Sequence, residues 1–205
     1  MDYREHWEKV YSRTPLHKVG WYRPHLETSF DWITHLPLSA DSPIIDVGCG
    51  ASTLIDDLLH HGFQSITAVD LSAQALAVLQ ERLGYQAKQV TFIQGDITSI
   101  SLPGQAFQLW HDRAVFHFLT QKEARESYVR QVLHARQPGG YLLIATFAPE
   151  APPKCSGLPV QRYDVPDICQ VFSPHFQLQR HQKERHITPG GVEQMYLYCL
   201  FQRVD

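Results

Sequence analysis

The sequence predicts a single-domain α/β fold built on a doubly wound, mostly parallel sheet, and three observations lead to that prediction. The chain has 205 residues, which is enough for one domain with a substantial core. Short apolar runs alternate with amphipathic stretches over residues 43–147, as is typical of strand–helix–strand units around a parallel sheet. Two extended runs around a Pro-Gly-Gly turn near the C-terminus predict an antiparallel C-terminal hairpin at the edge of that sheet.

Composition is that of an ordinary globular protein, with 43% hydrophobic and 19% charged residues. The formal net charge of −3 gives no bulk electrostatic signature for nucleic acid, so a nucleic-acid partner is disfavoured. We also expect no membrane association, because no run approaches the roughly 18 apolar residues of a membrane span and the N-terminus lacks a signal-peptide core. The four cysteines show no CxxC pair, which fits reduced thiols and a cytoplasmic location.

Residues 1–38 are predicted to form a helical lead-in that acts as a lid, and residues 39–205 the domain that follows it. The first helix carries one face of aromatic and apolar residues at helical spacing, namely Tyr3, Trp7, Val10 and Tyr11. The second helix is predicted from Phe30, Ile33 and Leu36.

Apolar runs predict the strands of the sheet in chain order. The runs that we assign to strands are residues 43–47, 65–71, 90–96, 107–112 and 141–147. Helices are predicted between strands over residues 54–61, after Ser72 and after Thr120, from apolar residues three or four positions apart. Ser72 is expected to cap its helix. Thr120 and Glu123 suggest a capping box for a helix that stops at the Pro-Gly-Gly of residues 138–140.

The C-terminal part departs from this alternation. Residues 148–159 are rich in proline and read as a loop, and a short helix is expected over residues 164–172. The runs 176–187 and 193–203 then form the predicted hairpin. Because the first run is mostly polar, part of this hairpin should face solvent.

The loop after the first strand, "DVGCGAS", is the first candidate ligand site. Ligands of open α/β sheets bind beyond the carboxyl ends of the strands, and Gly48 and Gly50 let the backbone turn and approach a ligand closely. The third glycine of a dinucleotide fingerprint is replaced by Thr53, which weakens a pyrophosphate-binding interpretation. Asp46 would repel phosphates and suits a ligand that carries an amine or hydroxyls.

Acidic residues also end the next three predicted strands: Asp70, Asp96 and Asp112. At the place of Asp70 a carboxylate typically accepts hydrogen bonds from ribose hydroxyls, and a carboxylate at the place of Asp96 suits the exocyclic amine of an adenine. Each one singly is equally well explained as a helix cap. Their occurrence with Asp46 after four successive strands favours a ligand site.

Together these motifs resemble the class I S-adenosylmethionine-dependent methyltransferases. The matching segments are "IIDVGCGAS", "ITAVDLS", "FIQGDI", "FQLWHDRAVFHFL" and "QPGGYLLIATF". The resemblance implies a Rossmann-like sheet of seven strands with a reversed last strand, an enzyme, and S-adenosyl-L-methionine as cofactor. It assigns residues 39–205 to the methyltransferase domain.

The resemblance also implies which residues hold the cofactor. Gly48 and Gly50 would approach its methionine part, Asp70 its ribose, and Asp96 with Ile97 its adenine, while Asp112 or the neighbouring backbone carbonyl would meet its amino group. The full set of predicted cofactor-binding residues is Asp46, Gly48, Gly50, Asp70, Leu71, Asp96, Ile97 and Asp112. One departure from the family's usual D/E-x-G-x-G-x-G loop is Ser52 at the last glycine position, which still allows close packing.

The stretch "WHDRAVFHFLT" supplies the candidates for catalysis, His117 and Arg113. A histidine near neutral pKa can remove a proton from an acceptor, although His117, between two phenylalanines, equally fits a histidine packed in an aromatic wall. Arg113 is expected to pair with Asp112, with another carboxylate such as Asp46, or with an anionic substrate. We expect no metal site and interpret His111 as structural, since adjacent side chains on a strand point in opposite directions.

Two segments are predicted to shape the acceptor site. Trp21, Tyr22 and Arg23 combine aromatic faces with a cation, and Arg162 follows a long loop at the ligand edge of the sheet; these four are the predicted substrate-binding residues. Cys155 in that loop is either a soft substrate contact or a small packed residue.

Three functions stay open from the sequence. The leading one is methylation of a small molecule at oxygen, nitrogen or sulfur, because no appended recognition domain or basic face is evident. The alternative is a protein lysine N-methyltransferase, since the "HWEKVY" and "GWY" segments resemble the lead-in of some class I lysine methyltransferases. The remoter alternative is a nucleotide-binding module without catalysis. The oligomeric state cannot be read from the sequence.

Overall fold

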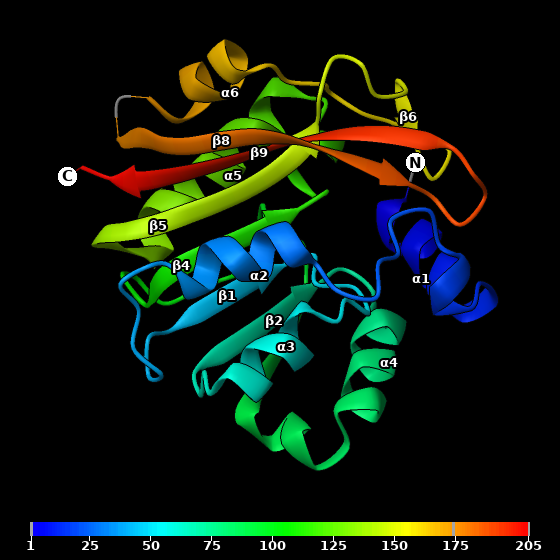
Figure 1. Cartoon of the computed structure of the whole chain (residues 1–205), viewed down its shortest axis with the longest axis horizontal. Coiled ribbons are helices and arrows are strands. Elements are labelled where there is room, and N and C mark those ends of the chain that lie inside the picture. Colours follow the sequence, from blue (N-terminus) through cyan, green and yellow to red (C-terminus); the bar gives the residue numbers. More distant parts are fainter. Residues whose placement is uncertain (1, 174, 205) are drawn as a thin grey trace.

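The computed structural model describes residues 2–173 and 175–204. Its centre is a seven-stranded sheet of order β3-β2-β1-β4-β5-β9-β8, covered by helices on both faces (Figure 1). The strands of this sheet are β1 (Ile44–Val47), β2 (Ile66–Asp70), β3 (Val90–Gln94), β4 (Phe107–Arg113), β5 (Arg136–Phe147), β8 (Phe176–Ile187) and β9 (Glu193–Arg203). A separate two-stranded ladder pairs β6 (Lys154–Cys155) with β7 (Leu158–Pro159).

Six α-helices and three short 3₁₀ turns are described around the sheet. The helices are α1 (Tyr3–Arg13), α2 (Glu27–Thr34), α3 (Leu54–His61), α4 (Ala73–Leu83), α5 (Lys122–Ala135) and α6 (Val165–Phe172). The 3₁₀ turns are η1 (Leu16–Lys18), η2 (Gly84–Gln89) and η3 (Phe116–Phe118).

The pairing of the strands confirms the predicted fold class. β1 pairs in parallel with β2 and β4, and the parallel ladders continue to β3 on one side and β5 on the other. β9 runs antiparallel to both β5 and β8, so the hairpin forms the predicted antiparallel edge and β9 is the reversed strand. The bounds of β8 and β9 coincide with the two runs read from the sequence.

Strand alternation divides the core between the two faces of the sheet. Ile44 and Leu109 pack with α2, α3 and α4 on one face, whereas Ile45 and Trp110 pack with α5 and α6 on the other. All four side chains are fully buried. Since successive side chains on a strand point to opposite faces, His111 and Arg113 face the first layer and Asp112 faces the second.

Of the two predicted helix caps, one is confirmed and one is wrong. Ser72 accepts a hydrogen bond from the amide of Ala75 at 3.1 Å, as predicted, and Asp164 begins α6 with a capping box. The predicted capping box of Thr120 is wrong, because α5 begins at Lys122 with no side-chain cap. Arg125 instead donates to the carbonyl of Thr120 at 2.8 Å, and so satisfies a backbone group next to the helix start.

The predicted end of α5 is also displaced. The helix stops at Ala135, and β5 begins at Arg136, so the Pro-Gly-Gly segment lies inside the strand. Gly139 has a φ of 69°, and the register between β4 and β5 shifts between Phe107 and Leu109. The glycines therefore mark an irregularity of the strand rather than a helix stop.

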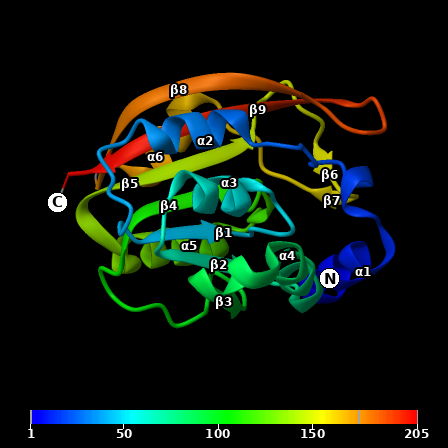
Figure 2. The same ribbon diagram turned by 60° about the horizontal axis from the view of Figure 1, so that its bottom comes forward.

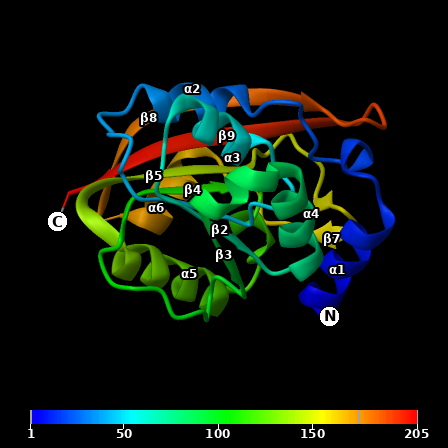
Figure 3. The same cartoon turned by 90° about the horizontal axis from the view of Figure 1, so that it is seen from below.

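α1 lies next to α4 beyond one end of the sheet, and β6 and β7 lie on the same side of the molecule (Figures 2 and 3). This is the end at which the parallel strands β1 to β4 finish. In the residues that the structure describes, no helix is long and apolar enough to cross a membrane.

Candidate functional site

Two adjoining pockets open at the carboxyl ends of the parallel strands. They enclose about 940 and about 470 Å³ of space, open solvent at their mouths included. The larger pocket lies over the ends of β1, β2, β3 and β4. Its lining combines strand ends with α1, η3 and the loop after β5: Tyr3, Trp7, Tyr11, Trp21, Val47, Gly48, Val69, Asp70, Leu71, Gly95, Asp96, Ile97, Arg113, Ala114, Val115, Phe118, Leu119 and Cys155.

The glycine loop after β1 forms the floor between the two pockets. Gly48 and Gly50 have φ values of 60° and 53°, in the left-handed region that favours glycine. A Cβ at Gly48 would lie 1.9 Å from Cγ2 of Val115, and one at Gly50 would lie 2.2 Å from the hydroxyl of Tyr11. Both the backbone conformation and the close contacts therefore require glycine at these two positions.

Asp46 presents a free acceptor to the smaller pocket. Its Oδ1 lies 2.6 Å from Nδ1 of His111, whose Nε2 lies 2.9 Å from the hydroxyl of Ser29. A neutral histidine that donates to Asp46 and accepts from Ser29 satisfies both contacts, so His111 positions the carboxylate. Oδ2 of Asp46 is buried without a partner among the described residues. Since buried polar atoms are normally hydrogen-bonded, this oxygen is suited to a ligand donor such as an ammonium group.

Asp70 ends β2 with both carboxylate oxygens fixed by backbone amides. Oδ2 accepts from Gly50 and Oδ1 accepts from Ser72, each at 2.8 Å. Each oxygen keeps further acceptor capacity, and the residue lines the larger pocket together with Leu71. Burial raises the pKa of Asp70 from its ordinary 3.8 to about 6. The carboxylate is thus ionised at neutral pH and suited to a pair of hydroxyl donors.

Asp96 and Ile97 follow β3 at the same pocket. Oδ1 of Asp96 accepts from the amide and the hydroxyl of Thr98, at 2.8 and 2.7 Å, so this residue does cap a turn. Ile97 is buried and stands with Val69 and Leu71 in the lining. An apolar wall with a carboxylate beside it suits a flat heterocycle that carries an amino group.

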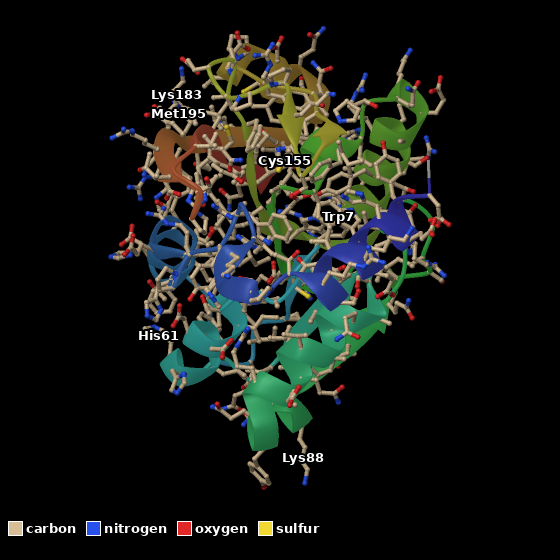
Figure 4. The ribbon with its side chains drawn as sticks, turned by 90° about the vertical axis from the view of Figure 1, so that its right-hand side faces the viewer. Trp7, His61, Lys88, Cys155, Lys183 and Met195 are labelled. Atoms are coloured by element: carbon tan, nitrogen blue, oxygen red, sulfur yellow. The ribbon has the colours of Figure 1, made fainter. Side chains whose placement is uncertain are left out.

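α1 covers the larger pocket with aromatic side chains. The ring of Trp7 meets the rings of Trp21 and Phe118 edge-on, with centroids 5.4 and 5.3 Å apart. Figure 4, which faces this end of the molecule, shows Trp7 from α1 and Cys155 from β6 near the middle of the face. Tyr3, Trp7 and Tyr11 line the pocket but were not among the site residues predicted from the sequence. Their spacing of four positions on one helix face was the signal for them.

Glu8 fastens α1 to the start of α4. Its Oε1 accepts from the amide of Ala73 at 2.7 Å, and its Oε2 accepts from the hydroxyl of Ser72 at 2.8 Å and the amide of Gln74 at 3.1 Å. The carboxylate therefore satisfies amides that a helix start leaves free, at the positive end of the helix dipole.

Arg113 lines both pockets, on the face opposite to Asp112. Nε donates to the hydroxyl of Tyr198 at 3.0 Å, Nη1 donates to the carbonyl of Trp21 at 3.2 Å, and the guanidinium lies 4.4 Å from the ring centroid of Tyr196. Among the described residues it forms neither of the ion pairs considered from the sequence, with Asp112 or with Asp46. No other carboxylate there lies within ion-pair distance, and its Nη2 has no hydrogen-bond partner.

The carboxylate of Asp112, one of the two groups expected to meet the cofactor's amino group, lines neither pocket. It accepts from the amides of Val115 and Phe116 at 2.9 and 3.1 Å and from the hydroxyl of Tyr128 at 2.6 Å. Burial raises the pKa of Asp112 to about 6. The side chain fastens the turn after β4 to α5, because the alternation of β4 turns it to that layer.

His117 occupies the aromatic wall rather than the pocket lining. Its ring packs edge-on against Phe118 and Phe147, and its Nδ1 accepts from the amide of Phe147 at 3.2 Å. The side chain is fully buried, and burial together with the charge of Arg113 lowers its pKa to about 3. His117 lines neither pocket, so the structure favours the interpretation as a packed histidine over the role as a base.

The predicted substrate-binding residues divide into two groups. Trp21 lines both pockets, and Tyr22 and Arg23 line the smaller one, where Arg23 is paired with Glu184 at 2.5 Å. Arg162 is exposed, lines neither pocket, and donates to the carbonyls of Pro149 and Ala151. It therefore holds the loop after β5 in shape, and its place outside both pockets does not favour the predicted role in substrate binding.

Cys155, which the sequence left open, lies in the lining of the larger pocket. It is 3% exposed, and burial raises the pKa of its thiol to about 11. Cys155 is therefore a neutral thiol at the pocket wall.

Comparison with known proteins identifies related sequences and folds. A family model described as a methyltransferase domain matches residues 44–140. EEF1A lysine methyltransferase 2 of Danio rerio is 23% identical over 203 residues, which cover 92% of this chain and 81% of that protein. The eEF1A lysine and N-terminal methyltransferase of Mus musculus is 28% identical over 129 residues, 62% of this chain. This chain spans only 18% of the length of the mouse protein.

A solved structure of an S-adenosylmethionine-dependent methyltransferase from Methanosarcina mazei superimposes with a TM-score of 0.71. The match covers 84% of this chain and 97% of that one at 16% sequence identity. At this identity the likeness concerns the fold.

Proposed function

Since this chain is a class I S-adenosylmethionine-dependent methyltransferase, we propose that it transfers the methyl group to a small-molecule acceptor with an acidic nucleophile, such as a thiol or a carboxylic acid. The observation that carries the proposal is the acceptor side of the pocket, which is covered by aromatic rings and contains the buried cation Arg113.

The residues around the glycine loop fit the cofactor. We infer that Asp70 takes the ribose hydroxyls, Asp96 with Ile97 the adenine, and Asp46 the ammonium of the methionine part. The pocket lining and the unpartnered Oδ2 of Asp46 support these roles. Gly48 and Gly50 keep the floor free of side chains, where a Cβ would collide with its surroundings. When bound, S-adenosylmethionine supplies a methyl group whose bond to the sulfonium breaks as the bond to the acceptor forms, leaving S-adenosylhomocysteine.

The chain's own contribution is then chiefly to orient the acceptor and to exclude water. Trp7, Trp21 and Phe118 close one side of the pocket. Holding two reactants in line in such an enclosure lowers the barrier without any further chemistry from the protein.

No general base lies on the acceptor side among the described residues that line the pocket. Arg113 is a permanent cation, the thiol of Cys155 has its pKa raised to about 11, and the neighbouring His117 is neutral and shielded. An acceptor must therefore lose its proton to water, which favours nucleophiles that ionise near neutral pH. A lysine amine, with an ordinary pKa of about 10.4, is disfavoured by this and by repulsion between its ammonium and Arg113.

Protein lysine methylation is the second candidate. It is favoured by the Danio rerio relative, named as a lysine methyltransferase and covered over most of its length. The aromatic face of α1 is also compatible with an alkylammonium group.

The two candidates are separated by one labelling experiment. Purified protein and methyl-labelled S-adenosylmethionine are incubated with a cell extract divided at about 3 kDa into small molecules and proteins. Label in the small-molecule fraction, absent with an Asp70→Asn variant, supports the proposal. Label confined to lysine residues of the protein fraction contradicts it and supports the second candidate.

A further inference from the structure

Arg113 carries a buried charge that forms no direct ion pair in the described chain. The carboxylate of Glu184 acts on this charge through space, but it is itself paired with Arg23. Arg113 is 8% exposed, and its contacts are the hydroxyl of Tyr198, the carbonyl of Trp21 and the ring face of Tyr196. These are neutral partners. A buried cation is normally paired with an anion because its desolvation costs several kcal/mol.

Two other arginines near the site show the usual arrangement. Arg23, at the smaller pocket, is paired with Glu184 at 2.5 Å, and Arg82, behind the glycine loop, is paired with Asp56 at 2.7 Å. Arg113 differs from both because Nη2 is shielded from solvent and has no partner among the described residues.

The register of the sheet explains how the cation is held. Arg113 of β4 lies beside Ala145 of β5, which lies beside Tyr198 of β9. Because Ala145 is small, the guanidinium crosses over it and its Nε reaches the hydroxyl of Tyr198 at 3.0 Å. This leaves Nη2 and one N–H of Nη1 without an assigned partner. Two parallel N–H donors on a guanidinium match the two oxygens of a carboxylate.

In the larger pocket, Arg113 is not among the residues assigned to the adenosine, although it also lines the smaller pocket, where Asp46 is assigned to the methionine part. The residues proposed for adenosine are Asp70, Leu71, Asp96 and Ile97, whereas Arg113 lines the pocket with Trp7, Phe118 and Cys155. The aromatic rings among these provide an apolar surface for the body of a ligand, and the cation provides its anchor.

From this arrangement we infer that Arg113 is the anchor of an acceptor subsite for small organic carboxylates, whose apolar body lies against Trp7 and Phe118. The inference rests on the proposed function and narrows it, since it names the charged group by which the small molecule is recognised. A carboxylate at Arg113 has one other possible source, the methionine part of the cofactor, because Arg113 also lines the smaller pocket.

The test measures binding of acetate, benzoate and indole-3-acetate, each beside its neutral amide, to protein saturated with S-adenosylhomocysteine. Trp7 and Trp21 lie in the site, so tryptophan fluorescence is a direct readout, with calorimetry as a second one. We expect at least one carboxylate to bind tenfold or more tightly than its amide. This preference should disappear in Arg113→Met, persist in part in Arg113→Lys, and be unchanged in Arg185→Met, an exposed arginine of the hairpin.

A second arm separates the two sources of the carboxylate. S-adenosylhomocysteine and 5′-methylthioadenosine, which lacks the amino-acid part, are titrated into wild type and Arg113→Met, and thermal unfolding and the less disruptive Arg113→Lys verify that the variants are folded. Unchanged affinity for both supports the acceptor subsite. Weaker binding of S-adenosylhomocysteine alone assigns Arg113 to the cofactor and overturns the inference, as does a set of carboxylates that bind no better than their amides.

Failure of the inference is distinguishable from failure of the proposed function. Labelled small molecules that carry no carboxylate would overturn the subsite and leave small-molecule methylation standing. Label found only in protein would overturn the proposed function itself.

Discussion

Replacement of Asp70 by asparagine tests the cofactor site at its most constrained residue. The carboxylate accepts one backbone amide on each oxygen, from Gly50 and from Ser72, both at 2.8 Å. Asparagine has a single acceptor oxygen, and its amide nitrogen must then face one of these two N–H groups. The variant therefore loses one backbone hydrogen bond, the negative charge, and one of the two acceptor positions proposed for the ribose.

The expected magnitude follows from these losses. A hydrogen bond to a charged group contributes about 1.5–3 kcal/mol, so loss of one such bond to the ribose weakens cofactor binding about 10- to 150-fold. The backbone amide of Gly50 or Ser72 that loses its acceptor in the variant weakens cofactor binding further. Because the native side chain is buried and its pKa is raised to about 6, the neutral asparagine does not suffer the desolvation that the carboxylate does. We therefore expect the unliganded variant to stay folded.

The assay is calorimetric titration with S-adenosylhomocysteine at pH 7.5, for wild type, Asp70→Asn and the control Asp41→Asn. Asp41 is exposed and does not line either pocket, so the control changes the same charge without touching the site. Thermal unfolding without ligand verifies the fold of each variant. An Asp70→Asn protein that is folded and binds as tightly as wild type would falsify the ribose assignment.

Four further outcomes are expected. The native pKa of Asp70 is about 6, above its ordinary 3.8, so protonation of this carboxylate at low pH competes with binding of the ribose hydroxyls. The affinity for S-adenosylhomocysteine should therefore be full above pH 7 and fall by up to about tenfold per pH unit below pH 6. Asp70→Asn, titrated over the same range, should show no such change. Glu8→Gln weakens the contact between α1 and α4, so amide hydrogen exchange of residues 3–13 should accelerate about 5- to 30-fold while exchange in β4 stays the same. Gly50→Ala places a Cβ 2.2 Å from the hydroxyl of Tyr11 at a φ of 53°, which should lower the free energy of unfolding by at least about 1–2 kcal/mol in denaturant titration; unchanged stability would contradict the tight packing of α1 on the loop. His117→Ala should cost about 2–5 kcal/mol of stability through the cavity it leaves, whereas turnover per folded molecule should stay within about twofold, and a turnover loss of a hundredfold or more at full stability would restore His117 as the base.

Local patterns in the sequence predicted most of the fold. The strand and helix bounds depend on spacing that any reader of the sequence can count, and the bounds of β8 and β9 were read to the residue. Caps were less predictable. The cap of Ser72 was predicted, whereas the capping box of Asp164 was not, and α5 begins without a side-chain cap. The carbonyl of Thr120 is served by Arg125, one turn into the helix, which no capping motif describes.

The residues proposed to bind the cofactor could be selected from the sequence because each candidate stands at or next to the end of a strand. Parallel strands carry Asp46, Asp70 and Asp96 to one edge of the sheet, whatever else the chain does. Asp112 also stands at the end of a strand, but its side chain points away from the pockets. The alternation of side chains along β4 directs it towards Tyr128 of α5, and only the packing of α5 shows that the carboxylate oxygens of Asp112 already accept hydrogen bonds.

The sequence by itself therefore determined the sheet, the glycine loop and the edge at which the proposed cofactor residues lie, since these follow from periodicity and from residues close together in the chain. Tertiary structure alone decided what happens to the charges on the acceptor side. Arg113 remains without an anion because its reach across Ala145 ends on Tyr198, some 85 positions later in the chain. His117 stays neutral because Phe147 and Phe118 enclose its ring and exclude the water that its charged form requires, which lowers its pKa. Burial and contacts between residues far apart in the chain determine the state of Arg113 and of His117, and neither can be deduced from local sequence patterns.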